Sequence, residues 1–172
     1  MIDLNRNRFV RGAVAGLALL AVGAASVTGA AHAAGIMTQE MFVNYYKLFS
    51  ANDPRYGDML DENVYYPHIT GRVFHNRKEV MAFYASMMQS GVIETRTPTT
   101  IVIDNADGLA AVELTVHITA KPGAHPTLPT GEKVNPGDDW VGHNMMIYGI
   151  KGDKIISIRG ASSGALPFKK MN

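Results

Sequence analysis

Two residues with chemically useful side chains, Tyr66 and His68, flank Pro67 at the end of a short β-like segment, residues 62–66. Period-two alternation puts Tyr66 and His68 on one face of this strand. An imidazole with an ordinary pKa can act as a general base near neutral pH, and a neutral phenol can donate a hydrogen bond. The segment therefore predicts a small-molecule site in which His68 moves a proton and Tyr66 binds the ligand.

Helical signals flank this segment. Asp53-Pro54 is a favoured helix start, with Asp as the cap and Pro in the first turn. Asn76 with Glu79 forms a capping-box pattern, and Gly91 fits a left-handed helix stop. The predicted helices are 39–50, 54–60 and 77–89.

After residue 92 the apolar residues recur with a period of two, which indicates strands. Asp107-Gly108 is a hairpin signal. The Pro/Gly-rich segment 121–138 is expected to be either a flap or a hairpin excursion. Residues 161–172 show no periodicity and are expected to be a tail. The predicted strands are 99–105, 110–120, 140–150 and 154–160.

This order of elements predicts an α+β fold in which a curved antiparallel sheet wraps around the N-terminal helices. A twisted sheet that buries one face against helices leaves a pocket between the layers. No repeat or second domain is evident, so residues 34–172 are expected to form a single domain.

The N-terminus has the pattern of a secretory signal peptide over residues 1–33. Arg6, Arg8 and Arg11 precede an uncharged Ala/Gly-rich run, and Ala31-His32-Ala33 fits the small-x-small cleavage pattern. An uncleaved transmembrane anchor is the alternative. The expected location is periplasmic or secreted, in a bacterium, with no membrane association after cleavage.

Charge and cysteine content narrow the function classes. The segment 1–33 holds three arginines and one aspartate, so its removal changes the net charge from +1 to about −1. A chain without a basic patch is not expected to bind nucleic acid. The sequence has no cysteine, which excludes thiol catalysis and disulfides.

Several motifs together resemble the NTF2-like superfamily, in particular its SnoaL-like and ketosteroid isomerase-like members. They are Tyr45 in the first helix, the strand end Asn63-Val64-Tyr65-Tyr66-Pro67, Gly71 before the third helix, and the closing hairpin Gly152-Asp153-Lys154-Ile155-Ile156. The resemblance covers residues 38–162 and implies a cone-shaped α+β fold.

The resemblance also implies roles for individual residues. Tyr45 matches the isomerase tyrosine, Tyr66 stands where the base aspartate would be, and Asn144 falls near the late-strand aspartate. The isomerase carboxylates are therefore not matched. Tyr45 and Asn144 would polarise a ligand oxygen, with His68 as the third catalytic residue.

The remaining site predictions follow from strand faces. Asp139 is an alternative acid/base group. His117 and His143 fall on the opposite, outer face, where a homodimer interface is expected rather than a metal site. The predicted substrate-binding wall consists of Tyr66, Trp140, Met146, Tyr148, Leu114 and Val116.

The leading hypothesis is an exported protein that binds a small, mostly apolar molecule bearing a carbonyl or hydroxyl group. It would catalyse proton transfer of the isomerase, dehydratase or cyclase type without a metal or organic cofactor. The alternative is a non-catalytic ligand-binding or dimerisation module of the same fold.

Overall fold

The helices begin at the residues that the capping patterns in the sequence predict, and they end within one residue of the predicted ends. The structure, a computed structural model, describes residues 35–162 and 169–171, so the predicted signal peptide lies outside the described residues. The helices are α1 (Gln39–Ser50), the 3-10 helix η1 (Pro54–Met59) and α2 (Arg77–Gln89). No helix in these described ranges is long and apolar enough to cross a membrane.

Side-chain caps explain these helix starts. The Thr38 hydroxyl accepts a hydrogen bond from the Met41 amide at 3.2 Å. At α2, the Asn76 side chain accepts from the Glu79 amide at 2.9 Å, and the Glu79 carboxylate accepts from the His75 amide at 2.9 Å. Each cap satisfies backbone donors that the first helical turn leaves unpaired, so the cap residues fix the starts.

The strands form one curved, mixed sheet in the order β2-β1-β6-β5-β4-β3, with β7 pairing to β5. The expected α+β fold with a curved, mostly antiparallel sheet is confirmed, and the sheet is mixed because β1 pairs parallel to β6. The strands are β1 (Leu60–Pro67), β2 (Val73–Phe74), β3 (Val92–Asp104), β4 (Leu109–Ala120), β5 (Asp139–Lys151), β6 (Lys154–Ser162) and β7 (Lys169–Met171).

Two strand predictions are corrected. β3 begins at Val92 rather than at residue 99, and it pairs with β4 from Val92↔Ala120 onward. A register shift between Pro98 and Thr100 breaks the alternation, which hid the first half of the strand. The expected tail also contains strand structure, because β6 continues to Ser162 and β7 pairs with the start of β5.

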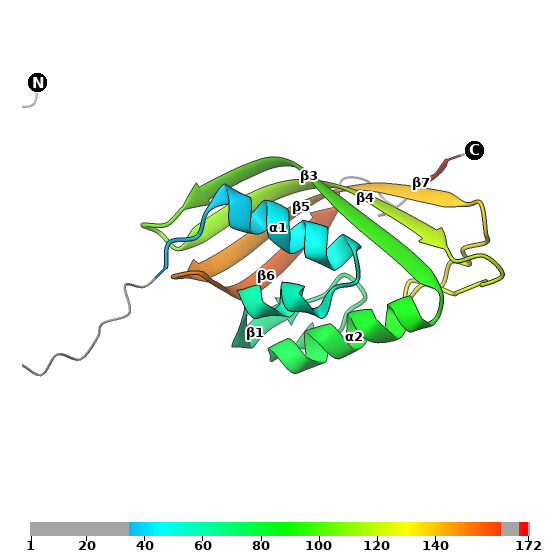
Figure 1. The fold of residues 1–172 in the computed structure, drawn as a ribbon, viewed down its shortest axis with the longest axis horizontal. Coiled ribbons are helices and arrows are strands. Elements are labelled where there is room, and N and C mark those ends of the chain that lie inside the picture. Colours follow the sequence, from blue (N-terminus) through cyan, green and yellow to red (C-terminus); the bar gives the residue numbers. More distant parts are fainter. Residues whose placement is uncertain (1–34, 163–168, 172) are drawn as a thin grey trace, which may run out of the picture. The chain divides into compact units, whose positions relative to one another are not determined.

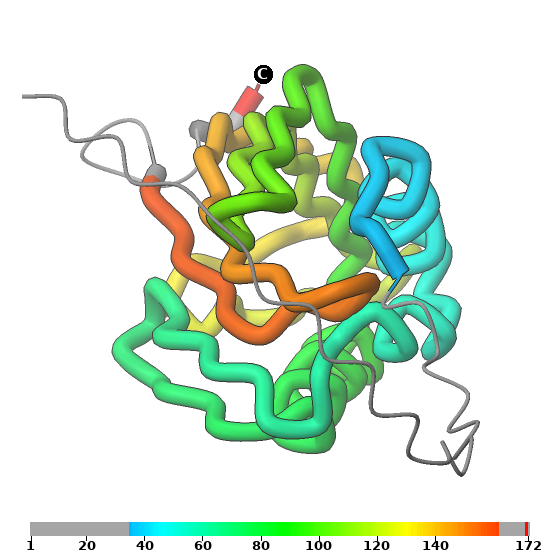
Figure 2. The backbone as a smooth tube through the Cα atoms, turned by 90° about the vertical axis from the view of Figure 1, so that its left-hand side faces the viewer, coloured from blue at the N-terminus to red at the C-terminus, as the bar shows by residue number. Residues whose placement is uncertain are grey.

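The core lies between the inner face of the sheet and the helices. Alternate β4 residues, including Val112, Val116 and Ile118, are buried, and they belong to the same apolar cluster as the α1 residues Phe42 and Phe49. In Figure 1, α1 lies across the upper strands and α2 runs below them; Figure 2 shows the same arrangement from the side. The concave face therefore points at both helices.

Candidate functional site

A small cavity lies within this concave face. It has a volume of about 60 Å³, and we call it the inner cavity. The end of β1, helix α2, the sheet interior and the 121–138 loop all contribute walls, so it depends on the whole fold. Its lining residues are Tyr66, His68, Ile69, Thr70, Tyr84, Met87, Glu94, Arg96, Ile118, Leu128, Pro129, Thr130, Met146 and Gly160.

The 121–138 loop closes one side of the inner cavity through Leu128, Pro129 and Thr130. It folds back on itself, since the Leu128 amide donates to the Glu132 carbonyl at 2.8 Å and the Val134 amide donates to the Pro126 carbonyl at 3.0 Å. Leu128 and Val134 are buried and anchor the loop to the core. Of the two alternatives left open by the sequence, the contacts favour the flap.

A buried ion pair forms the polar centre of the cavity. The Arg96 Nε donates to Glu94 Oε1 at 2.6 Å, and their side chains are only 10% and 7% exposed. The two residues are neighbours on the inner face of β3. The Arg96 guanidinium carbon also lies 4.0 Å from the ring centroid of Phe49 and 5.0 Å from that of Tyr84. Ionic and cation-π contacts therefore hold the guanidinium in one place.

A pair of phenols extends this polar centre. Arg96 Nη2 donates to the Tyr84 hydroxyl at 2.9 Å, and the Tyr84 and Tyr66 hydroxyls lie 3.2 Å apart. A guanidinium can only donate, so the hydrogen bond between the two phenols uses one of their two protons. The other phenolic proton remains for an acceptor in the inner cavity. Burial, followed by the neighbouring Tyr84, raises the pKa of Tyr66 well above its usual value, so Tyr66 is neutral.

His68 stands at the turn between β1 and β2. Its amide donates to the Arg72 carbonyl at 2.8 Å, and Gly71 in this turn has a φ of 79°. His68 Nδ1 lies 2.9 Å from Thr70 Oγ1 and accepts from the Thr70 amide at 3.3 Å. Since a backbone N–H can only donate, Nδ1 is the acceptor and Nε2 carries the proton of the neutral ring.

The surroundings of His68 keep its imidazole neutral. Burial, together with the positive charges of Arg96 and Arg72, lowers the pKa of His68 from 6.5 to about 4. A base with so low a pKa takes up little of a substrate's proton at neutral pH. The low pKa and the proton on Nε2 therefore favour His68 as a hydrogen-bond donor over the general base that the sequence predicts.

This pKa shift has a measurable consequence for stability. The unfolded chain protonates His68 below pH 6.5, whereas the folded protein does so only below about pH 4. The free energy of unfolding should therefore fall as the pH is lowered from 6.5 to about 4. In His68→Gln this part of the pH dependence should be absent in urea denaturation series. An unchanged pH profile in the variant would show that His68 titrates normally in the folded protein.

The structure brings three of the predicted site residues together at the inner cavity, namely Tyr66, His68 and Met146. Tyr45 is buried on α1 instead, edge-on to the rings of Tyr46 and Tyr56 at 5.1 and 6.1 Å, and it is not a lining residue. Its role in polarising an oxygen stays a prediction.

The other predicted residues lie on β4 and β5 outside the lining of the inner cavity, and two of them, Asn144 and Leu114, line a separate, larger pocket instead. Asn144 Oδ1 and Trp140 Nε1 are buried and have no hydrogen-bond partner among the residues that the structure describes. The hydroxyls of Tyr148 and Tyr46 form a short hydrogen bond with each other. Leu114 and Val116 are buried apolar wall residues. Their assignments to substrate binding also stay predictions.

Sequence analysis did not assign three ionisable residues of the cavity to the site: Glu94, Arg96 and Tyr84. Glu94 and Arg96 lie in the half of β3 that the predicted strand left out. The available signal was the spacing Glu94-x-Arg96, which puts both charges on one strand face beside buried Val92. A carboxylate does therefore stand in the pocket, on a strand where the isomerase comparison did not place one.

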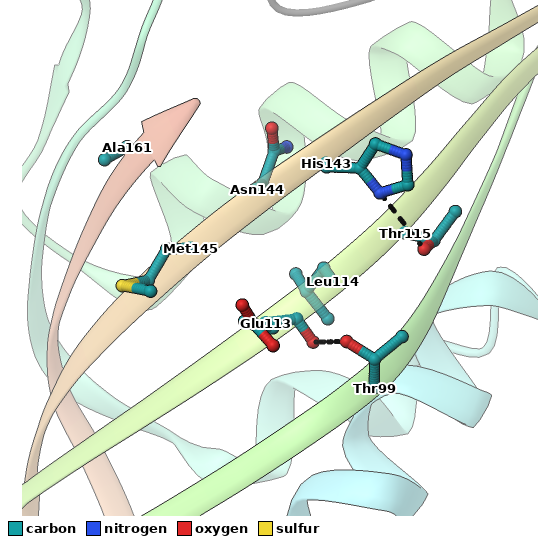
Figure 3. A pocket seen from close by; sticks show the side chains of 8 residues that line it. All are labelled: Thr99, Glu113, Leu114, Thr115, His143, Asn144, Met145 and Ala161. Carbon is teal, nitrogen blue, oxygen red and sulfur yellow. Dashed lines mark hydrogen bonds between the residues drawn. The ribbon is translucent and has the colours of Figure 1, made fainter. Parts of the chain in front are cut away.

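A larger, open pocket of about 500 Å³ lies on the outer face of the sheet. Figure 3 shows its lining, in which the side chains of His143 and Thr115 are hydrogen-bonded and the Thr99 hydroxyl donates to the backbone carbonyl of Glu113. His117 lies on the same face, and its Nδ1 is 3.0 Å from a carboxylate oxygen of Asp139. Asp139, the alternative acid/base group, therefore points away from the inner cavity. Ligand sites enclose most of their ligand, which favours the inner cavity as the small-molecule site.

Comparison with known proteins supports the fold. No protein-family profile matches the sequence, and no curated protein sequence matches it. Solved structures do match. A protein from Pseudomonas putida KT2440 assigned as a polyketide cyclase has a TM-score of 0.58 at 25% identity over 74% of this chain and 92% of its own. A similar assignment holds for a protein from Xanthomonas campestris pv. campestris, with a TM-score of 0.59 at 17% identity over 70% and 86% of the two chains.

A third similar structure is an epoxide hydrolase/cyclase-like enzyme of pyran ring formation in salinomycin. Its TM-score is 0.57 at 16% identity, over 75% of this chain and 92% of that enzyme. The expected resemblance to NTF2-like proteins of the SnoaL-like and ketosteroid isomerase-like types is thereby confirmed. The chain has the NTF2-like α+β fold.

Proposed function

We propose that this protein is an exported SnoaL-like enzyme that catalyses cofactor-free proton transfer on a small, mostly apolar molecule bearing a carbonyl or hydroxyl group. The observation that supports the proposal is the buried chain Glu94–Arg96–Tyr84–Tyr66 in the wall of the inner cavity. In this chain the Arg96 guanidinium contacts the Glu94 carboxylate on one side and the phenols, which hold one spare proton, on the other.

These groups divide the chemistry between them. Among the described residues, Glu94 Oε1 receives the Arg96 hydrogen bond and no residue donates to Oε2. Oε2 is therefore the atom that would remove a proton from the substrate. The spare phenolic proton of Tyr66 or Tyr84 would bind the substrate oxygen and stabilise the negative charge that develops there. Arg96 donates hydrogen bonds to Glu94 and Tyr84 and so fixes the position of the carboxylate relative to the phenols.

The reaction types named for the similar proteins suit this arrangement. The similar structures include proteins named as polyketide cyclases, a ketosteroid isomerase and an epoxide hydrolase. Ring closure, isomerisation and epoxide opening each need a proton removed from one atom and charge stabilised on an oxygen. A carboxylate beside a phenol donor can serve all three reaction types.

The size of the inner cavity constrains how a substrate enters. About 60 Å³ is far below the roughly 300–1,000 Å³ typical of small-molecule sites. Met87 and Met146 line it, and unbranched methionine side chains rearrange easily. We therefore infer that a substrate displaces these side chains or lifts the tip of the 121–138 loop.

A substrate screen with the 34–172 protein tests the proposal. Small epoxides and enolisable ketones are incubated without added cofactor, and products are followed by chiral gas chromatography with mass spectrometry. Turnover of at least one class is expected. If compounds of both classes raise the melting temperature but none is converted, the protein is the non-catalytic binding module instead.

Export forms part of the proposal and rests on the sequence of residues 1–33. Expression of the full chain in a Gram-negative host should give a periplasmic protein whose N-terminus is Ala34, measured by intact-mass spectrometry. Replacing Ala31 and Ala33 with bulky residues should block the cleavage. A full-length protein in the membrane fraction of the unsubstituted chain would indicate the uncleaved anchor.

We further propose a homodimer through the outer sheet face. Met145 and Ile147 on this face are 47% and 46% exposed. Burying such side chains against a second copy would remove apolar surface from water. Sedimentation velocity should therefore give a dimer for the unsubstituted protein and a monomer for Met145→Glu. Val43→Glu, at a 50% exposed position on α1, is the matched control and should stay dimeric.

A further inference from the structure

A second small cavity lies behind the ion pair, between the C-terminal ends of α1 and α2. It has a volume of about 70 Å³, and we call it the rear cavity. It shares one residue with the inner cavity, which is Glu94. Its lining residues are Ser50, Asn52, Met88, Val92, Ile93, Glu94 and Lys121.

Glu94 thus separates two cavities that have different linings. On the inner side its neighbours include Tyr66, Tyr84 and Met146. On the rear side they include a hydroxyl, an amide and an ammonium group. Glu94 itself is 6% exposed, so its contact with solvent passes through one or both of these cavities.

The rear cavity suits water rather than an apolar ligand. Ser50 Oγ accepts a hydrogen bond from the Arg96 amide at 2.8 Å and donates to the Arg96 carbonyl at 3.4 Å, which leaves one oxygen lone pair for a water. Lys121 Nζ donates to the Met88 carbonyl at 3.2 Å and keeps two further protons. A cavity holds a water when it exceeds roughly 10–15 Å³ and offers two to four polar partners. At about 70 Å³ the rear cavity has the space, and Ser50, Lys121 and Glu94 supply the partners.

The rear cavity also begins at the protein surface. Asn52 and Lys121, which both line it, are exposed. Asn52 has a φ of 54°, a left-handed conformation that turns the chain sharply after α1 and leads it into η1. The opening of the rear cavity therefore lies between this turn and Lys121, at the start of the 121–138 loop. The loop tip at residues 128–130, which closes the inner cavity, takes no part in it.

We propose that the rear cavity is a water-filled port through which Glu94 exchanges its proton with bulk solvent while a substrate fills the inner cavity. The inference rests on the proposed function, since it assigns Glu94 as the acid/base group. A substrate under the closed 121–138 loop blocks the inner route. A proton taken from the substrate by Glu94 then passes to a water in the rear cavity, which leaves the carboxylate and a hydronium ion that diffuses out.

The test measures chemical access to position 94 from the rear side. The chain has no cysteine, so Glu94→Cys gives a single reporter thiol. Gly160→Leu closes the inner side, because a Cβ at Gly160 would already lie 3.1 Å from Met146 Sδ. The rate of reaction with methyl methanethiosulfonate is measured in this Glu94→Cys/Gly160→Leu protein, alone and with a third substitution at Lys121.

Lys121→Trp places an aromatic ring over the rear opening, whereas Lys121→Met keeps a slender side chain and removes only the charge. Because thiol reactions depend on access, we expect Lys121→Trp to slow the reaction at least about tenfold and Lys121→Met to change it less than about twofold. An equal rate in both Lys121 variants would overturn the port.

The remaining outcomes separate the port from the proposed function. If Glu94→Cys reacts but adding Gly160→Leu abolishes the reaction, the port is wrong and Glu94 remains accessible from the inner cavity. If no variant reacts, both proposals are contradicted.

A second measurement covers the case in which Glu94→Cys does not fold. Hydroxyl-radical footprinting of the chain with Glu94 intact compares Met88, which lines only the rear cavity, with Met146, which lines only the inner one; both are 5% exposed. Lys121→Trp should slow the oxidation of Met88 and leave Met146 unchanged. Equal Met88 oxidation with and without Lys121→Trp would overturn the port.

Discussion

Replacing Arg96 with methionine is expected to lower the free energy of unfolding by about 3–5 kcal/mol, because the substitution leaves the Glu94 carboxylate buried without its partner. Both side chains are at most 10% exposed, so water cannot readily replace the lost ion pair. Methionine keeps the apolar stem that packs on Phe49, so the loss reports mainly on charge. Urea denaturation followed by circular dichroism measures it.

Two further variants make this result specific. Glu94→Leu/Arg96→Met removes both charges and should recover most of the stability, since a buried ion pair is often replaceable by apolar residues. Arg55→Met breaks an ion pair with Asp53 in which the arginine side chain is 72% exposed, and it should change stability little. A small effect of Arg96→Met, equal to that of Arg55→Met, would mean that solvent reaches the Glu94 carboxylate freely in the folded protein.

Replacing Glu94 with glutamine should reduce kcat by about 10²–10⁴-fold on any substrate found in the screen, which is the usual contribution of a positioned acid/base group. Glutamine keeps the shape and an oxygen that accepts the Arg96 hydrogen bond, so KM should change much less. The matched control is Glu113→Gln, an exposed carboxylate on the outer face of β4. Steady-state kinetics of the two variants decide the assignment.

Removing a phenol should produce a second, separable effect. Tyr66→Phe leaves Tyr84 hydrogen-bonded to Arg96 but removes one of the two cavity phenols. Loss of one donor to a developing oxyanion costs about 10²–10³-fold in kcat. Full activity in Tyr66→Phe, with Tyr84→Phe inactive, would assign the spare proton to Tyr84. Full activity in Glu94→Gln would remove the carboxylate from the mechanism altogether.

The starts of the helices could be read from the sequence because they depend on neighbouring residues, and the chain between two of these signals contains two residues of the inner cavity. The Asn76 and Glu79 side chains cap α2 within one turn, and Pro67 ends the strand that carries Tyr66. Such local interactions leave a signature at fixed spacing along the chain. The stretch from β1 to α2 therefore identified two cavity residues, Tyr66 and His68, without any knowledge of the sheet.

Which ionisable side chains line the inner cavity was decided only by the tertiary structure. Glu94 and Arg96 come from β3, Tyr84 from α2 and Tyr66 from β1, and no spacing in the sequence links these three elements. The register shift at Pro98–Thr100 hid the strand that brings the charges inward, and pairing with β4 fixes which face they take. Likewise, the pKa of His68 depends on Arg96, which is distant in sequence. Local patterns thus identified two residues of the inner cavity, whereas long-range strand pairing determined which charged side chains line it with them.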